Sequence, residues 1–137
     1  MNKKERAMMQ VLKDNSPALA ELRETGQTYS RYDCFVPDKV WVELKHRGNT
    51  THYADTLIEY DKYDYLTGFG VTAVYAVYSC GKLYVFNLSK LKHNGYDFGW
   101  ENRYCNKTTE FSSRHKISKR VGYIDWEMAD RVIQCDL

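Results

Sequence analysis

The stretch YDCFVPDKVWVELK at residues 32–45 carries the clearest structural pattern of this sequence. Two runs rich in β-branched and aromatic residues, 32–36 and 40–45, flank a Pro-Asp-Lys segment at 37–39. The length and residue types of that segment are typical of a hairpin loop. The stretch therefore predicts a β-hairpin, whose register follows from the loop.

The register of this hairpin places two carboxylates side by side. Pairing of Val36 with Val40 across the loop puts Asp33 directly opposite Glu43, with β-carbons ~5 Å apart on one face of the sheet. Lys45 points to the same face, because it lies two residues beyond Glu43. The opposite face is apolar and consists of Cys34, Val36, Val40, Val42 and Leu44. The hairpin is thus expected to bury one face and to present an acidic pair with an amine on the other.

Two carboxylates this close repel each other unless a cation lies between them. Oxygen ligands from short side chains and a backbone carbonyl suit Mg²⁺, and the Leu44 carbonyl is the natural third ligand beside Asp33 and Glu43. A lysine beside such a metal can orient or help deprotonate an attacking water, while the metal polarises a phosphate oxygen and stabilises the developing charge. Asp33, Glu43, Leu44 and Lys45 therefore predict a site for phosphodiester hydrolysis.

These residues resemble the PD-(D/E)XK nuclease superfamily. The resemblance covers roughly Lys3 to Leu88 and is carried by Asp33, Glu43-Leu44-Lys45, His46-Arg47, and a helix with Tyr53 and Lys62. It implies a restriction-endonuclease-like αβββαβ core, with a mixed central sheet flanked by helices. It also implies that Asp33 and Glu43 bind Mg²⁺, with Mn²⁺ as a substitute, and that Lys45 assists the water. The proline that the family often has before its first Asp is absent, since Tyr32 stands there.

Members of that superfamily often carry a further acidic residue in the first helix, and two residues compete for this place. Glu5 is the better positional match, but Glu21 competes with it if residues 18–25 are helical. Arg47 and Lys62 are the candidates for contacts to phosphate groups. The alternative for the whole cluster is an exposed Asp–Glu–Lys ion-pair network on a sheet face, which is common in proteins and contributes little.

Several elements are predicted on the N-terminal side of the chain. Asn2–Lys13 is predicted to be a helix, because its apolar residues recur at helical spacing on one side. The segment 18–25 favours either a short helix opened by Pro17 or an edge strand. A further helix is expected from a cap at Asn49, Thr50 or Thr51 to about Leu66.

The second half of the chain predicts strands, an irregular segment and a helix. Val71–Tyr78 and Leu83–Leu88 are predicted strands, and the first is expected to be buried on both faces because it has little polar alternation. Ser89–Lys116 loses periodicity and is expected to be a long surface excursion. Asp125 is expected to cap a last helix with Trp126, Ala129, Val132 and Ile133 on its apolar side.

The composition fits one α/β domain over residues 1–137, with a core of about 3–88 and a C-terminal elaboration over 89–137. Twenty Lys and Arg against 18 Asp and Glu give a formal net charge of +2, which excludes a purely electrostatic nucleic-acid binder. The longest uncharged apolar run, Val71–Tyr78, is far too short to span a bilayer. Four widely spaced cysteines, without zinc-site spacing, favour reduced thiols and a cytoplasmic location.

The last third of the chain mixes basic with aromatic residues: Lys90, Lys92, Arg103, Lys107, Arg114, Lys116, Lys119 and Arg120, with Tyr96, Phe98, Trp100 and Tyr104. Such a mixture can hold a nucleic-acid backbone and stack on exposed bases. The main expectation is a Mg²⁺-dependent endonuclease acting on DNA, with a homodimer as a further hypothesis and no membrane association. A non-catalytic nucleic-acid-binding module is the alternative, and a structural or inhibitory protein is a third hypothesis. The type of DNA stays open.

Overall fold

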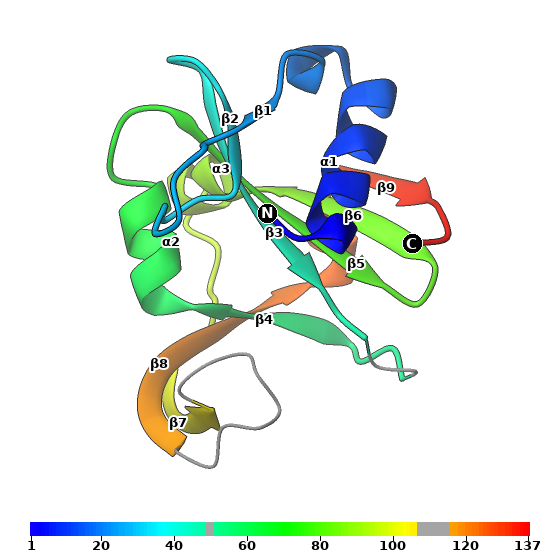
Figure 1. Ribbon diagram of the computed structural model, residues 1–137. Helices are drawn as coiled ribbons and strands as arrows, with labels where there is room; N and C mark the ends of the chain where they lie inside the picture. The colour runs from blue at the N-terminus through cyan, green and yellow to red at the C-terminus, as the bar shows by residue number, and fades with distance from the viewer. Residues whose placement is uncertain (49–50, 107–115) are drawn as a thin grey trace.

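The computed structural model of the protein describes residues 1–48, 51–106 and 116–137. These residues form a mixed α/β protein with three helices, a six-stranded mixed sheet and a three-stranded antiparallel sheet (Figure 1). The expected α/β class is therefore confirmed. Within the same ranges, no helix combines the length and the apolar character that a membrane crossing requires.

The predicted N-terminal helix is present as α1, Lys3–Asn15. The Glu5 N–H donates to the Asn2 side chain, and the Asn2 N–H donates to the Glu5 carboxylate, so a capping box closes the first turn. Met8 and Leu12 are buried against the larger sheet. The capping box thus fixes Glu5 at the start of the helix, a position that matters for the site below.

The larger sheet has the strand order β1-β2-β3-β5-β6-β9. β3 and β5 are parallel, and the other neighbouring strands are antiparallel. Its strands are β1 (Arg23–Glu24), β2 (Cys34–Val36), β3 (Val40–His46), β5 (Thr72–Ser79), β6 (Lys82–Asn87) and β9 (Arg131–Gln134). β5 is central, and all but its first residue are buried, which confirms the prediction for this segment.

The hairpin of β2 and β3 has the predicted register, with Val36 opposite Val40 and Cys34 opposite Val42. In its loop Asp38 has φ 61°, a backbone conformation that Asp tolerates better than most residues. Before the hairpin, both alternatives for residues 18–25 occur in part. A 3₁₀ turn, Pro17–Leu19, is followed by the short edge strand β1.

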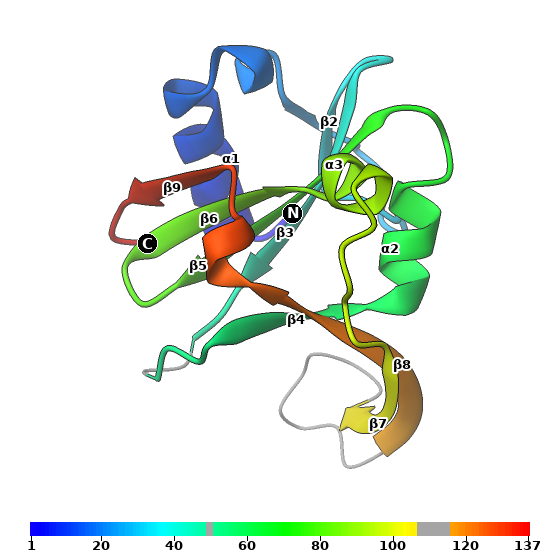
Figure 2. The ribbon, with the colours of Figure 1, turned by 180° about the vertical axis from the view of Figure 1, so that it is seen from behind.

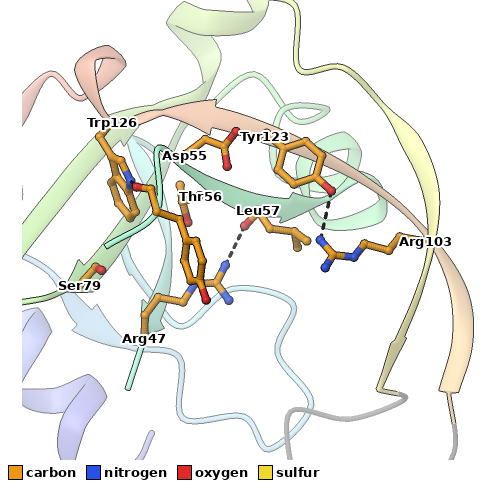
Figure 3. A pocket seen from close by; sticks show the side chains of 9 residues that line it. Arg47, Asp55, Thr56, Leu57, Ser79, Arg103, Tyr123 and Trp126 are labelled. Atoms are coloured by element: carbon orange, nitrogen blue, oxygen red, sulfur yellow. Dashed lines mark hydrogen bonds between the residues drawn. The ribbon is translucent and has the colours of Figure 1, made fainter. Parts of the chain in front are cut away.

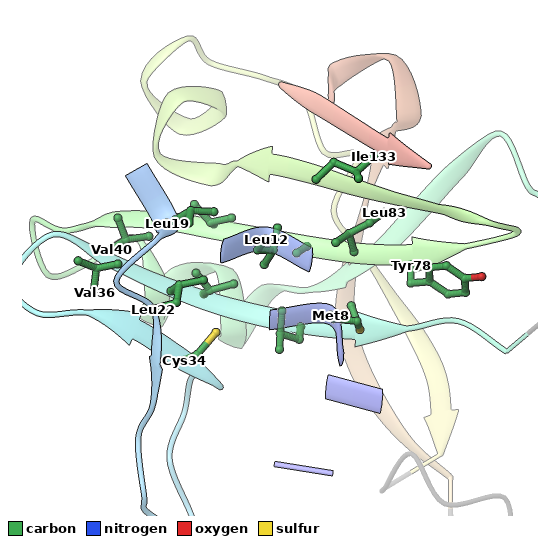
Figure 4. Packing of buried hydrophobic residues seen from close by; sticks show 14 residues of the cluster. Met8, Leu12, Leu19, Leu22, Cys34, Val36, Val40, Tyr78, Leu83 and Ile133 are labelled. Carbon is green, nitrogen blue, oxygen red and sulfur yellow. The ribbon is translucent and has the colours of Figure 1, made fainter. Parts of the chain in front are cut away.

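The larger sheet separates two hydrophobic clusters. On one face α1 covers the apolar residues of the hairpin, and Figure 4 shows Met8 and Leu12 over this face together with Cys34. On the other face lie α2 (Tyr60–Leu66) and α3 (Leu88–His93), which Figure 2 brings into view. The apolar face of the hairpin thus lies on the side of the sheet that α1 covers, and its polar face lies on the side of α2 and α3.

The helix expected from residues 49–51 to Leu66 is wrong over its first part. Asp55–Glu59 forms the strand β4, and only Tyr60–Leu66 is helical. β4 pairs with β8 (Lys116–Asp125), which also pairs with β7 (Glu101–Asn106), and these three strands make the smaller sheet. Thr56 and Ile58 are β-branched and both buried, so they suit a strand, but the partner strand lies much later in the chain. Asn49 and Thr50 lie outside the described residues.

Two C-terminal predictions are also wrong. The expected surface excursion over 89–116 contains most of α3 and all of β7, while its residues 107–115 lie outside the described part of the chain. Asp125 does act as a cap, but of a 3₁₀ turn, Trp126–Met128, and the next residues form β9 instead of a helix. β9 pairs with β6, and this pairing outweighs the helical spacing of its apolar residues.

The smaller sheet crosses beside the larger one, and the far ends of β7 and β8 project away from the rest of the molecule (Figures 1 and 2). β4 and β8 come close to α2 and to the polar face of β3. Two clefts form along β4, and two of the site residues predicted from the hairpin, Glu43 and Lys45, line the first of them.

Candidate active site

Glu43 lies in the middle of β3 and is buried, with only 8% of its surface exposed. Its Oε1 accepts a hydrogen bond from the Lys62 Nζ of α2 at 3.1 Å. Burial raises the pKa of the Glu43 carboxyl, although Lys62 and Lys45 act in the opposite direction. The Glu43 carboxyl thus lies at a buried position, where the positive charges of Lys62 and Lys45 stabilise its ionised form.

Asp33 lies one residue before β2, where the hairpin ladder ends. Its N–H donates to the Val42 carbonyl at 2.9 Å, and its Oδ2 accepts a hydrogen bond from the Leu44 N–H at 2.7 Å. Burial and the charge of Glu43 raise the pKa of Asp33 to about 7, and Glu5 raises it further, while the bond from Leu44 lowers it. The charge of Glu43 therefore acts on Asp33, although the regular pairing of the hairpin stops at Cys34.

Glu5 is the third acid of this cluster. Its charge and a hydrogen bond with its side chain both raise the pKa of Asp33, and its charge also raises the pKa of Glu43. Glu21, its competitor, is exposed and is not among the groups that shift either pKa. Of the two alternatives left open by the sequence, the structure brings Glu5 to the site and leaves Glu21 away from it.

The Leu44 backbone joins Asp33 to the strand edge. In a strand the N–H and C=O of one residue face the same neighbouring strand. Because the Leu44 N–H binds the Asp33 carboxylate, the Leu44 carbonyl faces the same edge, beyond the point where β2 ends. The Leu44 side chain is buried on the α1 face of the sheet. The Leu44 carbonyl thus lies on the same edge of β3 as the Asp33 carboxylate, and its part as a metal ligand stays a prediction.

Lys45 is half-buried beside Glu43 on the polar face of β3. Burial lowers the pKa of its amine, and the positive charges of Arg47 and Lys62 lower it further, whereas Glu59 and Glu43 act in the other direction. Among the described residues Lys45 forms no hydrogen bond or ion pair through its side chain. An amine in this environment gives up its proton more readily than an exposed lysine.

A cleft of about 360 Å³ opens between the polar face of β3, the helix α2 and the smaller sheet. Four predicted site residues line it: Glu43, Lys45, Arg47 and Lys62. Asp33 and Glu5 are not among the lining residues of the cleft. The cleft is rich in amines and is closed at its base by Tyr75 and Leu66.

Glu59 and Lys119 also line this cleft, and the sequence pattern did not single them out as a pair. The Lys119 Nζ lies 2.6 Å from the Glu59 Oε1, and the Lys62 Nζ lies 3.9 Å from the Glu59 Oε2. Burial raises the pKa of Glu59, but Lys119 and Lys62 more than offset this and lower it overall. Lys119 belongs to the basic last third of the sequence, and only the pairing of β8 with β4 brings it here.

Arg47 and Lys62 both reach the cleft, but they are held differently. The Arg47 guanidinium donates to the Leu57 carbonyl at 2.8 Å and lies 3.5 Å from the Tyr75 hydroxyl. For Lys62, burial lowers the pKa of the amine, yet Glu43 and Glu59 more than offset this and raise it. His46 lies apart from these residues, with its ring stacked on Tyr78.

Within the part of the chain that the structure describes, no group of three or more His, Cys, Asp or Glu side chains is placed so that it could by itself hold a metal ion. What the residues offer is an open, all-oxygen set of two or three carboxyls and one backbone carbonyl. Mg²⁺ is typically held by one or two carboxylates with water and phosphate oxygens completing its shell, so this donor set suits it. Burial raises the pKa of both Asp33 and Glu43, and the neighbouring negative charge of Glu43 raises that of Asp33 further, so a bound cation would favour the ionised carboxylates. Comparison of the chain with protein-family models, with curated proteins and with solved structures finds no match.

Proposed function

We propose that this protein is a Mg²⁺-dependent endonuclease that hydrolyses phosphodiester bonds of DNA. The observation that carries the proposal is the combination of two carboxyls, the buried Glu43 and the half-buried Asp33, with an adjacent half-buried lysine that has no ion-pair partner among the described residues. In a purely structural Asp–Glu–Lys network, the lysine would form an ion pair with one of the carboxylates. Here Lys62 takes one oxygen of Glu43, and Lys45 stays available to a reactant.

The roles follow from position. Asp33, Glu43 and the Leu44 carbonyl would hold Mg²⁺ or Mn²⁺, with Glu5 as the further acid, and the bound ion supplies Lewis-acid stabilisation of the developing negative charge. Lys45, with its lowered pKa, holds the attacking water and accepts its proton. Arg47, Lys62 and Lys119 provide positive charge for phosphate groups along the cleft.

The order of elements supports a PD-(D/E)XK core. α1 is followed by the antiparallel strands β1, β2 and β3, and later by α2 and β5, which is parallel to β3. This is the αβββαβ order that the resemblance implies, with β4 inserted before α2. The inserted strand belongs to the smaller sheet and forms one wall of the cleft.

A non-catalytic nucleic-acid-binding module is the second candidate, and the projecting smaller sheet favours it. Arg120 and Tyr104 are exposed on neighbouring strands of that sheet, and the Arg120 guanidinium lies 4.3 Å from the centre of the Tyr60 ring. Such residues can hold a nucleic-acid backbone without any chemistry. Both candidates predict DNA binding, and only the first predicts cleavage.

The test is cleavage of a supercoiled plasmid and of a four-way branched DNA in Mg²⁺ or Mn²⁺. We expect the wild type to cut at least one of them and Glu43→Gln and Lys45→Ala to be inactive. Lys39→Ala is the matched control, because Lys39 is an exposed lysine in the loop at the other end of β3. Equal cleavage by Lys45→Ala and Lys39→Ala would contradict the proposed role of Lys45. Tight DNA binding without cleavage in either metal would favour the binding module.

A further inference from the structure

A second cleft of about 480 Å³ lies along the same strand β4. It shares Arg47 and Leu57 with the first cleft, so the two are neighbours on either side of these residues. Figure 3 shows Trp126 and Arg103 at opposite sides of this second cleft, with Arg47 reaching the Leu57 carbonyl between them. None of the predicted acidic residues of the first cleft lines it.

Aromatic side chains form much of its wall, and one of them is held rigidly. The Trp126 indole N–H donates to the Tyr53 backbone carbonyl. The Trp126 ring packs against Tyr84 and His52, with ring centroids 4.3 and 4.7 Å apart. Tyr53 also lines the cleft and, in contrast, is 63% exposed. A fixed indole beside an exposed phenol ring suits a flat aromatic ligand.

Two arginines of the cleft suit the phosphate of a nucleotide, and one carboxylate, Asp55, also lines it. Arg47 forms no ion pair with a carboxylate among the described residues, so its charge is open to a phosphate. Arg103 donates to the Tyr123 hydroxyl at 3.2 Å on the far side. The wall also contains the Thr56 hydroxyl, which is 3% exposed as a residue and has no hydrogen-bond partner in the described structure.

We infer that the second cleft holds an unpaired nucleotide of the DNA strand whose neighbouring phosphate lies in the first cleft. Bases in a duplex are stacked on both faces, so only an unpaired or extruded base can lie against Tyr53 and Trp126. Arg47, shared by both clefts, then contacts the phosphate between the two positions. The inference rests on the proposed function and narrows its substrate to single-stranded DNA or to branched DNA with unpaired nucleotides.

The probe is a short single-stranded DNA with one 2-aminopurine, compared with the same strand in a blunt duplex, both with Ca²⁺ in place of Mg²⁺. We expect the single strand to bind and its 2-aminopurine fluorescence to be quenched by stacking. Tyr53→Ala should weaken single-strand binding by about tenfold and abolish the quenching, while duplex binding stays unchanged. The substitution keeps the backbone carbonyl that Trp126 binds, so the wall is preserved.

Two matched variants define the outcome. Tyr53→Phe keeps the ring and should bind like the wild type, and Tyr29→Ala removes a tyrosine that is 94% exposed and lines neither cleft. Equal binding by Tyr53→Ala and Tyr29→Ala would overturn the inference, even if the protein cleaves DNA. Quenching that depends on Tyr53 would support it, even if no metal produced cleavage, and in that case the nuclease proposal alone would fail.

Discussion

Asp33→Asn should stabilise the metal-free protein at alkaline pH, because burial and the charge of Glu43 make the ionised Asp33 carboxylate unfavourable in the folded state. The folded protein raises the pKa of Asp33 from 3.8 to about 7, chiefly through burial and the charge of Glu43. The folded state therefore prefers the protonated carboxyl more strongly than the unfolded state does. The stability that protonation supplies is complete below about pH 4 and is lost as the pH rises through about 7.

The magnitude follows from the size of the shift. A change of about three pKa units corresponds to about 4 kcal/mol. Because Asp33 is not fully buried and water screens part of the interaction, we expect about half of this, or roughly 2 kcal/mol, between pH 4 and pH 8. Asn has no charge to bury, and its side-chain oxygen can still accept the Leu44 N–H.

Urea unfolding with EDTA at pH 5 and pH 8 measures this effect. We expect the free energy of unfolding of the wild type to fall between these pH values and that of Asp33→Asn to change less, so that the variant is the more stable protein at pH 8. Asp38→Asn, an exposed change in the same hairpin, is the control and should follow the wild type. An Asp33→Asn variant that is less stable than the wild type at pH 8 would refute the argument.

Three further substitutions test other parts of the structure. Thr56→Val removes a buried hydroxyl without a partner and should raise the free energy of unfolding by about 1 kcal/mol in urea titrations; a loss of stability would mean that the hydroxyl is satisfied. Gly122→Ala places a Cβ 2.7 Å from the Trp100 ring and should lower the free energy of unfolding by about 1–3 kcal/mol. Gly48→Ala, whose Cβ has nothing within 4 Å, should change it little, and thermal unfolding of both variants checks this. Lys45→Arg keeps the charge but cannot release a proton, so the cleavage rate in Mg²⁺ should fall by about 100-fold or more, and a rate near that of the wild type would exclude Lys45 as the base.

The sequence sufficed for elements whose partners are close in the chain. The loop around Asp38 sets the register of the hairpin. This register predicts that Asp33 and Glu43 are neighbours, and in the structure the charge of Glu43 does act on Asp33. The capped helix α1 was equally local, since Asn2 and Glu5 close its first turn. Local chemistry of this kind needs no knowledge of distant segments.

The errors share one physical cause, which is pairing between distant strands. Apolar residues at 54–58 and at 126–133 have spacings that suit a helix, but β8 and β6 offer backbone hydrogen bonds to β4 and β9. The same pairings bring Lys119 and Tyr123 to the two clefts, so neither residue could be assigned from its neighbours. Glu5 and Glu21 were likewise separable only once the packing of α1 was known.

The central claim is that Asp33, Glu43 and the Leu44 carbonyl form a divalent-metal site. Anomalous diffraction from crystals soaked in Mn²⁺ tests it most directly. We expect one ion in contact with both carboxylates and with that carbonyl, and no ion in Glu43→Gln crystals treated in the same way. A wild-type crystal that cleaves bound DNA in Mn²⁺ while its ion lies elsewhere, with Lys62 still the only partner of Glu43, would contradict the account.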